Sequence, residues 1–193
     1  MVRHKWVTAG SIALGFLLGP VPASPQTKPM PKPSKQEEKI ENTLAHAVRH
    51  QLKALPFYSV FDFLDFSLDG AKVTLSGQVE RPTLKAEAEA AVKSLEGIGS
   101  VVNNIEVLPP SAADHEIARN IYRSIFEDAV LQKYAVEPVP PIHIIVKSGA
   151  VSLEGVVDSE ADKALAGNLA TKVPNVVGLR NNLVVHKKEI PAK

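Results

Sequence analysis

The chain has 193 residues and a formal net charge of +1, with 45% hydrophobic and 22% charged residues, as is ordinary for a globular protein. This balance argues against polyanion binding through bulk charge, so we expect no nucleic-acid partner. The absence of cysteine excludes disulfides, thiolate metal sites and a lipid anchor on cysteine.

The N-terminus has the pattern of a secretory signal peptide. A basic start at residues 3–5 precedes an apolar run from Trp6 to Gly19, and small residues lead to a cleavage position after Ala23. The run is shorter than the roughly 20 apolar residues of a membrane-spanning helix. We therefore predict a signal peptide at residues 1–23 and a periplasmic mature protein, free or peripheral to the membrane. The alternative is an uncleaved membrane anchor.

Proline-rich stretches divide the rest of the chain. Residues 24–35 combine proline and lysine with little to bury, so we expect an extended linker. A first module then occupies residues 36–108. A short linker, residues 109–113, separates it from a second module at residues 114–186, and residues 187–193 form a charged tail.

The first module is predicted to run helix, strand, strand, helix, strand. A stripe of apolar residues at every fourth position predicts its first helix: Ile40, Leu44, Val48 and Leu52. Alternating apolar residues predict a hairpin of residues 64–68 and 73–79 around Asp69-Gly70. An Ala- and Glu-rich helix at residues 81–95 then leads to a strand at residues 101–107.

The second module repeats this order. Its first helix is predicted from Ile117, Ile121 and Ile125, and its hairpin, second helix and last strand from residues 142–146, 149–157, 160–173 and 179–185. One offset of 78 residues maps Gly77 onto Gly155 and Asn103-Asn104 onto Asn181-Asn182. A shared offset over some thirty positions indicates an internal duplication.

The predicted fold class is therefore α+β, with two tandem αββαβ modules. Each module is expected to be a small mixed three-stranded sheet packed against two helices, because a helical crossover makes the third strand parallel to the second. The strand glycines Gly77 and Gly155 are expected where a helix backbone passes closely. Because such small cores are marginal alone, we expect the modules to pack on one another.

Two motifs carry a family resemblance. The pattern Gly-x-Val-x-Leu-x-Gly-x-Val, then a helix, then Ile98-Gly-Ser-Val-Val-Asn-Asn-Ile105, resembles the BON-domain family of bacterial envelope proteins. The second copy has the same pattern from Gly149, followed by Val176-Val-Gly-Leu-Arg-Asn-Asn-Leu183. The resemblance covers about residues 38–108 and 115–186.

The resemblance implies a non-catalytic periplasmic module that binds phospholipid surfaces and serves in osmotic-stress protection or envelope maintenance. It also implies that Gly70, Gly77, Gly149 and Gly155 are fold-defining positions, not a catalytic set. Nothing in it calls for a cofactor.

The first helix also has a cationic side, which we single out as a candidate binding site. At 100° per residue, one sector opposite the apolar stripe holds Lys39, His46, Arg49, His50 and Lys53. Such a side favours anionic headgroups, at about 1 kcal/mol per basic residue near the surface. The alternative is an ordinary solvated face. His46 and His50 are spaced to share a metal, but no third ligand is evident, so we predict no metal site.

The first helix of the second module carries a different candidate patch. Arg119 and Arg123 are flanked by Glu116 and Glu127, while Tyr122 and Phe126 extend the apolar side. Aromatic and arginine side chains favour a contact surface for lipid or an envelope protein. The alternative is that both aromatics complete the core.

No segment has the pattern of an active site. Ser152 lacks the strand-to-helix turn of a nucleophile elbow, and Asp62, Asp65 and Asp69 are expected as solvent-exposed positions of a strand and turn. The leading hypothesis is a non-enzymatic protein that binds an anionic phospholipid surface or an envelope protein. The alternative is a soluble, chaperone-like adaptor without lipid binding. The oligomeric state is left open.

Overall fold

The computed structural model describes residues 35–186, which belong to one compact unit. The predicted signal peptide with its cleavage position, nearly all of the first linker, and the charged tail lie outside the described residues.

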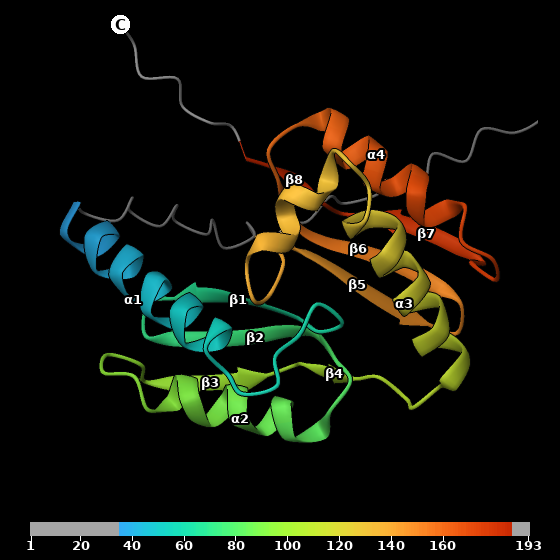
Figure 1. Ribbon diagram of the computed structural model, residues 1–193. Helices are drawn as coiled ribbons and strands as arrows, with labels where there is room; N and C mark the ends of the chain where they lie inside the picture. Colours follow the sequence, from blue (N-terminus) through green and yellow to red (C-terminus); the bar gives the residue numbers. More distant parts are fainter. Residues whose placement is uncertain (1–34, 187–193) are drawn as a thin grey trace, which may run out of the picture. The chain divides into compact units, whose positions relative to one another are not determined.

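The first module has the predicted order of elements (Figure 1). Its helices are α1 (Lys35–Lys53) and α2 (Pro82–Lys93), and its strands are β1 (Phe63–Asp69), β2 (Lys72–Val79), β3 (Ser100–Asn103) and β4 (Glu106–Val107). Strand β2 is central: β1 pairs with it antiparallel, and β3 and β4 pair with it in parallel. Alternate residues of β2 and the inward sides of α1 and α2 enclose one core of nine buried residues.

The second module repeats this arrangement with one addition. Its elements are α3 (Ala112–Phe126), the 3-10 helix η1 (Leu131–Val136), β5 (Ile142–Lys147), β6 (Ala150–Val157), α4 (Glu160–Thr171), β7 (Gly178–Asn181) and β8 (Val184–Val185). Strand β6 pairs antiparallel with β5 and parallel with β7 and β8. The α+β fold of two αββαβ modules is therefore confirmed. Helix α3 begins inside the predicted linker of residues 109–113, with Ser111 as its N-cap.

The duplicated asparagines interrupt the last strand of each module. Asn103 donates from its side chain to the Lys85 carbonyl of α2 at 2.9 Å, and its side-chain oxygen accepts the Ile105 N–H at 3.2 Å. Asn181 repeats the first bond with Lys163 of α4 at 2.7 Å. An amide that bonds a side chain does not join the ladder, so the single strand predicted in each module is two short strands. The side chain ties this interruption to the crossover helix.

The strand glycines are crowded by the neighbouring strand, and the expected helix contact is wrong. A Cβ on Gly77 would lie 2.0 Å from the Phe63 carbonyl oxygen, and one on Gly155 would lie 1.9 Å from that of Pro141. Both glycines also have positive φ, +117° and +112°. A β-carbon is thus excluded twice, by backbone conformation and by a backbone atom.

Two other expectations about module 1 need correction. Ile40 is 55% exposed, whereas Val48 and Leu52 in the same stripe are buried, because the first turns of α1 extend past the edge of the sheet (Figure 1). Asp62, expected in solvent, is only 3% exposed. Its carboxylate accepts the Ser59 hydroxyl at 2.8 Å and the Glu80 N–H at 2.9 Å.

The modules contact one another, as their small cores led us to expect. Val60, from the loop before β1, belongs to the buried core of module 2, and Phe61 packs against that core. The Val60 carbonyl also accepts the Ile144 N–H of β5 at 2.8 Å. One loop of module 1 therefore completes module 2.

Candidate functional site

The predicted cationic residues share one exposed side of α1. Lys39, His46, Arg49, His50 and Lys53 are all exposed, and Lys35 at the start of the helix extends the row. We call these six residues the basic face of α1. Among the described side chains, none of the six forms an ion pair within 4.0 Å. The lysine and arginine side chains of this face therefore present exposed positive charge.

The basic face ends at a groove. Arg49 lies over the Phe66 ring, 5.6 Å from its centroid, which fixes the guanidinium beside the sheet while leaving it exposed. Arg49 and Lys53 border a hollow of about 440 Å³ whose walls include Phe63 and Val184. Cations on one side of apolar walls suit an amphiphilic anion.

The patch on α3 has a mixed outcome. Arg119 and Arg123 are exposed. Phe126 is 6% exposed and completes the core, which is the alternative that the sequence left open. The Tyr122 ring lies 4.8 Å from that of Phe126 and 6.1 Å from that of Phe61, so part of its surface serves the contact between modules. The patch and the basic face are on different helices of different modules.

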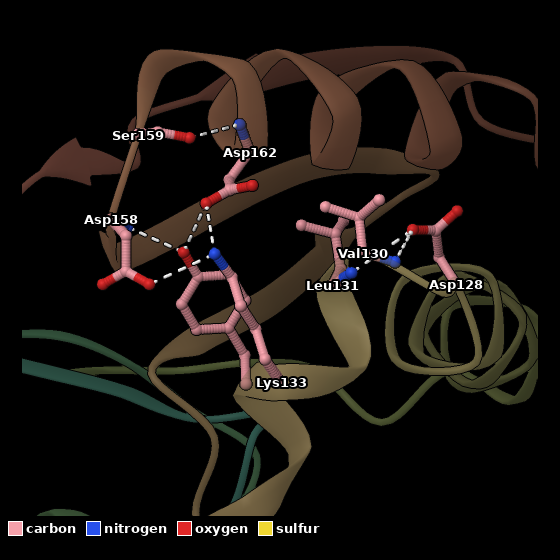
Figure 2. Close-up of polar contacts among 8 residues, drawn as sticks. Asp128, Val130, Leu131, Lys133, Asp158, Ser159 and Asp162 are labelled. Atoms are coloured by element: carbon pink, nitrogen blue, oxygen red, sulfur yellow. Dashed lines mark hydrogen bonds and ion pairs between the residues drawn. The ribbon is translucent and has the colours of Figure 1, made fainter.

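A polar cluster in module 2 was missed by the sequence analysis (Figure 2). The Tyr134 hydroxyl donates to Asp162 Oδ2 at 2.8 Å and accepts the Asp158 N–H at 2.7 Å. Lys133 Nζ lies 2.8 Å from Asp162 Oδ2 and 3.2 Å from Asp158 Oδ2. These bonds join η1 to the first turn of α4.

The contacts within this cluster shift the pKa values of its two acidic groups in opposite directions. Burial disfavours the charged form of Asp162, but hydrogen bonds from Lys133 and Tyr134 outweigh it, so the pKa of that carboxyl is lowered. Burial raises the pKa of Tyr134, which therefore stays a neutral donor. One sequence signal was available: Ser159-x-x-Asp162 is a helix-capping pattern, and Ser159 Oγ accepts the Asp162 N–H at 3.1 Å.

Buried histidine was also missed. His143 on β5 is 8% exposed, and its Nε2 lies 3.5 Å from the Tyr58 hydroxyl of module 1. Among the side chains that the structure describes, no three of His, Asp or Glu gather closely enough to hold a metal ion. No helix in the described part of the chain is long and apolar enough to cross a membrane.

Comparison with known proteins places the chain in a family. It is 31% identical over 124 residues to osmotically-inducible protein Y of Escherichia coli (strain K12), a match that covers 60% of this chain and 58% of that relative. The match therefore spans less than two thirds of the relative's length. The C-terminal domain of CdsD, a structural protein of the Chlamydia trachomatis type III secretion system, is 12% identical with a TM-score of 0.26 over 74% of this chain and 96% of that one. A TM-score that low carries no functional argument.

The family match coincides with the two modules. The BON domain matches residues 41–109 and again residues 113–187, which together make up most of the chain. Each matched segment holds one αββαβ module with its crowded strand glycine and its asparagine pair. The chain therefore belongs to the BON-domain family, as its sequence pattern predicted.

Proposed function

We propose that this protein is a non-catalytic periplasmic binding protein that associates with the anionic phospholipid surface of the bacterial envelope and serves in osmotic stress or envelope maintenance. Membership of the BON-domain family and the similarity to an osmotically-inducible protein support the setting. The exposed basic residues on one side of α1 are the observation that supports lipid binding.

The geometry of the basic face suits a flat anionic surface. Helix α1 has 19 residues, so its cations are spread over a helix about 28 Å long. Each basic side chain near an anionic membrane contributes about 1 kcal/mol of attraction. The opposite side of the helix is fixed by the buried Val48 and Leu52, so the cations can meet a membrane without unfolding the module.

Vesicle co-sedimentation tests the proposal. The parent protein should sediment with vesicles that contain phosphatidylglycerol and much less with pure phosphatidylcholine vesicles. Binding should weaken between 0.1 M and 1 M salt, because the screening length falls from about 10 Å to about 3 Å. Arg49→Glu with Lys53→Glu should abolish it. A control with the same change in charge, Lys72→Glu with Lys172→Glu, should bind like the parent.

The result for the double variant decides between surfaces. If Arg49→Glu with Lys53→Glu still sediments like the parent, the basic face of α1 is an ordinary solvent-exposed surface that does not bind lipid. Loss of binding in Arg119→Glu with Arg123→Glu would then assign lipid contact to α3.

A protein-interaction adaptor is the second candidate function. The neighbouring Val156 and Val184 pair across β6 and β8 and are 41% and 62% exposed, on the side of the sheet away from the core. Exposed aliphatic neighbours of this kind favour a protein partner. A parent protein that fails to sediment with any vesicle would favour this function.

A further inference from the structure

Strand β5 is buried on both of its faces. Ile142, Ile144 and Val146 point into the core of module 2, as alternation requires. His143 and Ile145 point the other way, yet they are only 8% and 4% exposed. A two-layer module leaves that side of its sheet open to solvent, so another part of the chain must cover these side chains. The cover comes from module 1.

The His143 ring packs among aromatic side chains of module 1. Its centroid lies 5.5 Å from the Tyr58 ring and 5.8 Å from the Phe63 ring. Nε2 faces the Tyr58 hydroxyl at 3.5 Å, and Nδ1 is buried with no hydrogen-bond partner among the described residues. An imidazolium is a donor at both nitrogens, so this enclosure accommodates the neutral ring and leaves a charged ring under-satisfied.

The surrounding charges do not compensate a proton on this ring. Burial lowers the pKa of His143; the backbone of Ser59 and Asp62 and the Asp62 carboxylate oppose that effect, and Lys53 of α1 adds to it. Asp65 of β1, Glu154 of β6 and Arg49 of α1 border the same groove, so charges of both signs lie around it. Burial also raises the pKa of Tyr58, so its phenol stays neutral and offers no negative charge.

We propose that neutral His143 stabilises the docking of module 2 on module 1, and that protonation of His143 weakens this docking. Because the docked state favours the neutral ring, docking is strongest above the ordinary histidine pKa of about 6.5. As the pH falls below that value, the docking constant drops by up to about tenfold per pH unit, until the pH reaches the lowered pKa of the docked ring.

Two other charged contacts cross between the modules. His115 lies 3.3 Å from Glu80, and this contact gains strength when His115 is protonated, which opposes release. Both side chains are partly exposed, so solvent weakens the contact. Lys147 pairs with Glu106 across a similarly exposed site and keeps its charge in the relevant pH range. The buried ring at His143 therefore sets the direction of the response.

Amide hydrogen exchange reports the docking directly. The Ile144 N–H bonds the Val60 carbonyl across the modules at 2.8 Å, whereas the Asn182 N–H bonds the Leu153 carbonyl within module 2 at 2.9 Å. After correction for intrinsic exchange, protection of Ile144 should fall between pH 7.5 and pH 5.5, by up to about tenfold. Protection of Asn182 should change little. The inference concerns docking alone and stands whether or not the protein binds lipid.

Variants assign the response to one ring. His143→Phe keeps an aromatic ring against Tyr58 and Phe63 and cannot titrate, so Ile144 protection should no longer depend on pH. If phenylalanine disturbs the fold, His143→Gln gives weaker but equally pH-independent docking. His115→Gln, the control, should retain the response. Equal Ile144 protection at both pH values in the parent would overturn the proposal, as would a response that persists in His143→Phe.

Discussion

The two modules hold the same backbone group with different side chains. Glu80 in module 1 and Asp158 in module 2 are equivalent positions at the end of the central strand. Asp62 Oδ1 accepts the Glu80 N–H at 2.9 Å, and the Tyr134 hydroxyl accepts the Asp158 N–H at 2.7 Å. Both acceptors come from the segment between the module's first helix and its hairpin, and Tyr134 lies in η1 of that segment. The duplication therefore kept an acceptor at this point and did not keep the residue that supplies it.

This difference extends into the second helix. Tyr134 also donates to Asp162 of α4. The position in module 1 that is equivalent to Asp162 is Leu84, which is 1% exposed and belongs to the core. Module 2 thus replaces an apolar contact with a polar clamp, made by the η1 insertion that module 1 lacks. Each of these partly buried N–H groups finds an acceptor, and the two modules supply it from different segments.

Replacing the strand glycines should give the largest effect, and the same effect in both modules. Gly155→Val forces a β-carbon against the Pro141 carbonyl at positive φ, so we expect a loss of about 2–4 kcal/mol in the free energy of unfolding. Gly77→Val should match it in module 1. Ser152→Val, on the opposite face of β6, should cost less than about 1 kcal/mol. Equal losses in denaturant melts of Gly155→Val and Ser152→Val would contradict this crowding at Gly155.

Removing each of the two acceptors should destabilise mainly the module that contains it. Asp62→Ala leaves the Glu80 N–H and the Ser59 hydroxyl without their acceptor. We expect it to lower the free energy of unfolding by about 2–3 kcal/mol. Tyr134→Phe leaves the Asp158 N–H without its acceptor and removes one of the donors to Asp162, which keeps its contact with Lys133. We therefore expect a loss of about 1–2 kcal/mol in the free energy of unfolding. Hydrogen exchange in each variant should show the loss mainly within its own module. A loss spread evenly over both modules would mean that they unfold as one unit.

Acid should act on the clamp of module 2. The lowered pKa of Asp162 stabilises the fold above the ordinary aspartate value of about 3.9, and this contribution is lost as the pH falls through the lowered pKa. Melts of the parent between pH 5 and pH 2 should therefore show a decline that is smaller in Asp162→Asn. Leu84→Met, a change at the apolar counterpart, should keep the full decline. An unchanged decline in Asp162→Asn would show that other carboxylates carry it.

The sequence could predict what is repeated and periodic. The order of elements follows from period and offset, and the structure bears it out. The burial of Asp62 could not be predicted, because its partner N–H at Glu80 lies 18 residues away and comes close only in the folded module. The burial of His143 could not be predicted for a similar reason, because the residues that cover it belong to the other module.

The smallest effect on stability should come from the residues that we expect to matter most for binding. Arg49 and Lys53 are exposed, form no ion pair with the described side chains, and lie opposite the buried stripe of α1. Arg49→Glu with Lys53→Glu should therefore change the free energy of unfolding by about 0.5 kcal/mol or little more, part of it from the Phe66 contact. Arg49→Gln with Lys53→Gln isolates the charge, because it keeps most of each side chain. Denaturant melts beside vesicle sedimentation would show whether both pairs lose binding while staying folded. A large loss of stability in the Gln pair would instead mean that the charges of these two side chains help to hold α1 to the sheet.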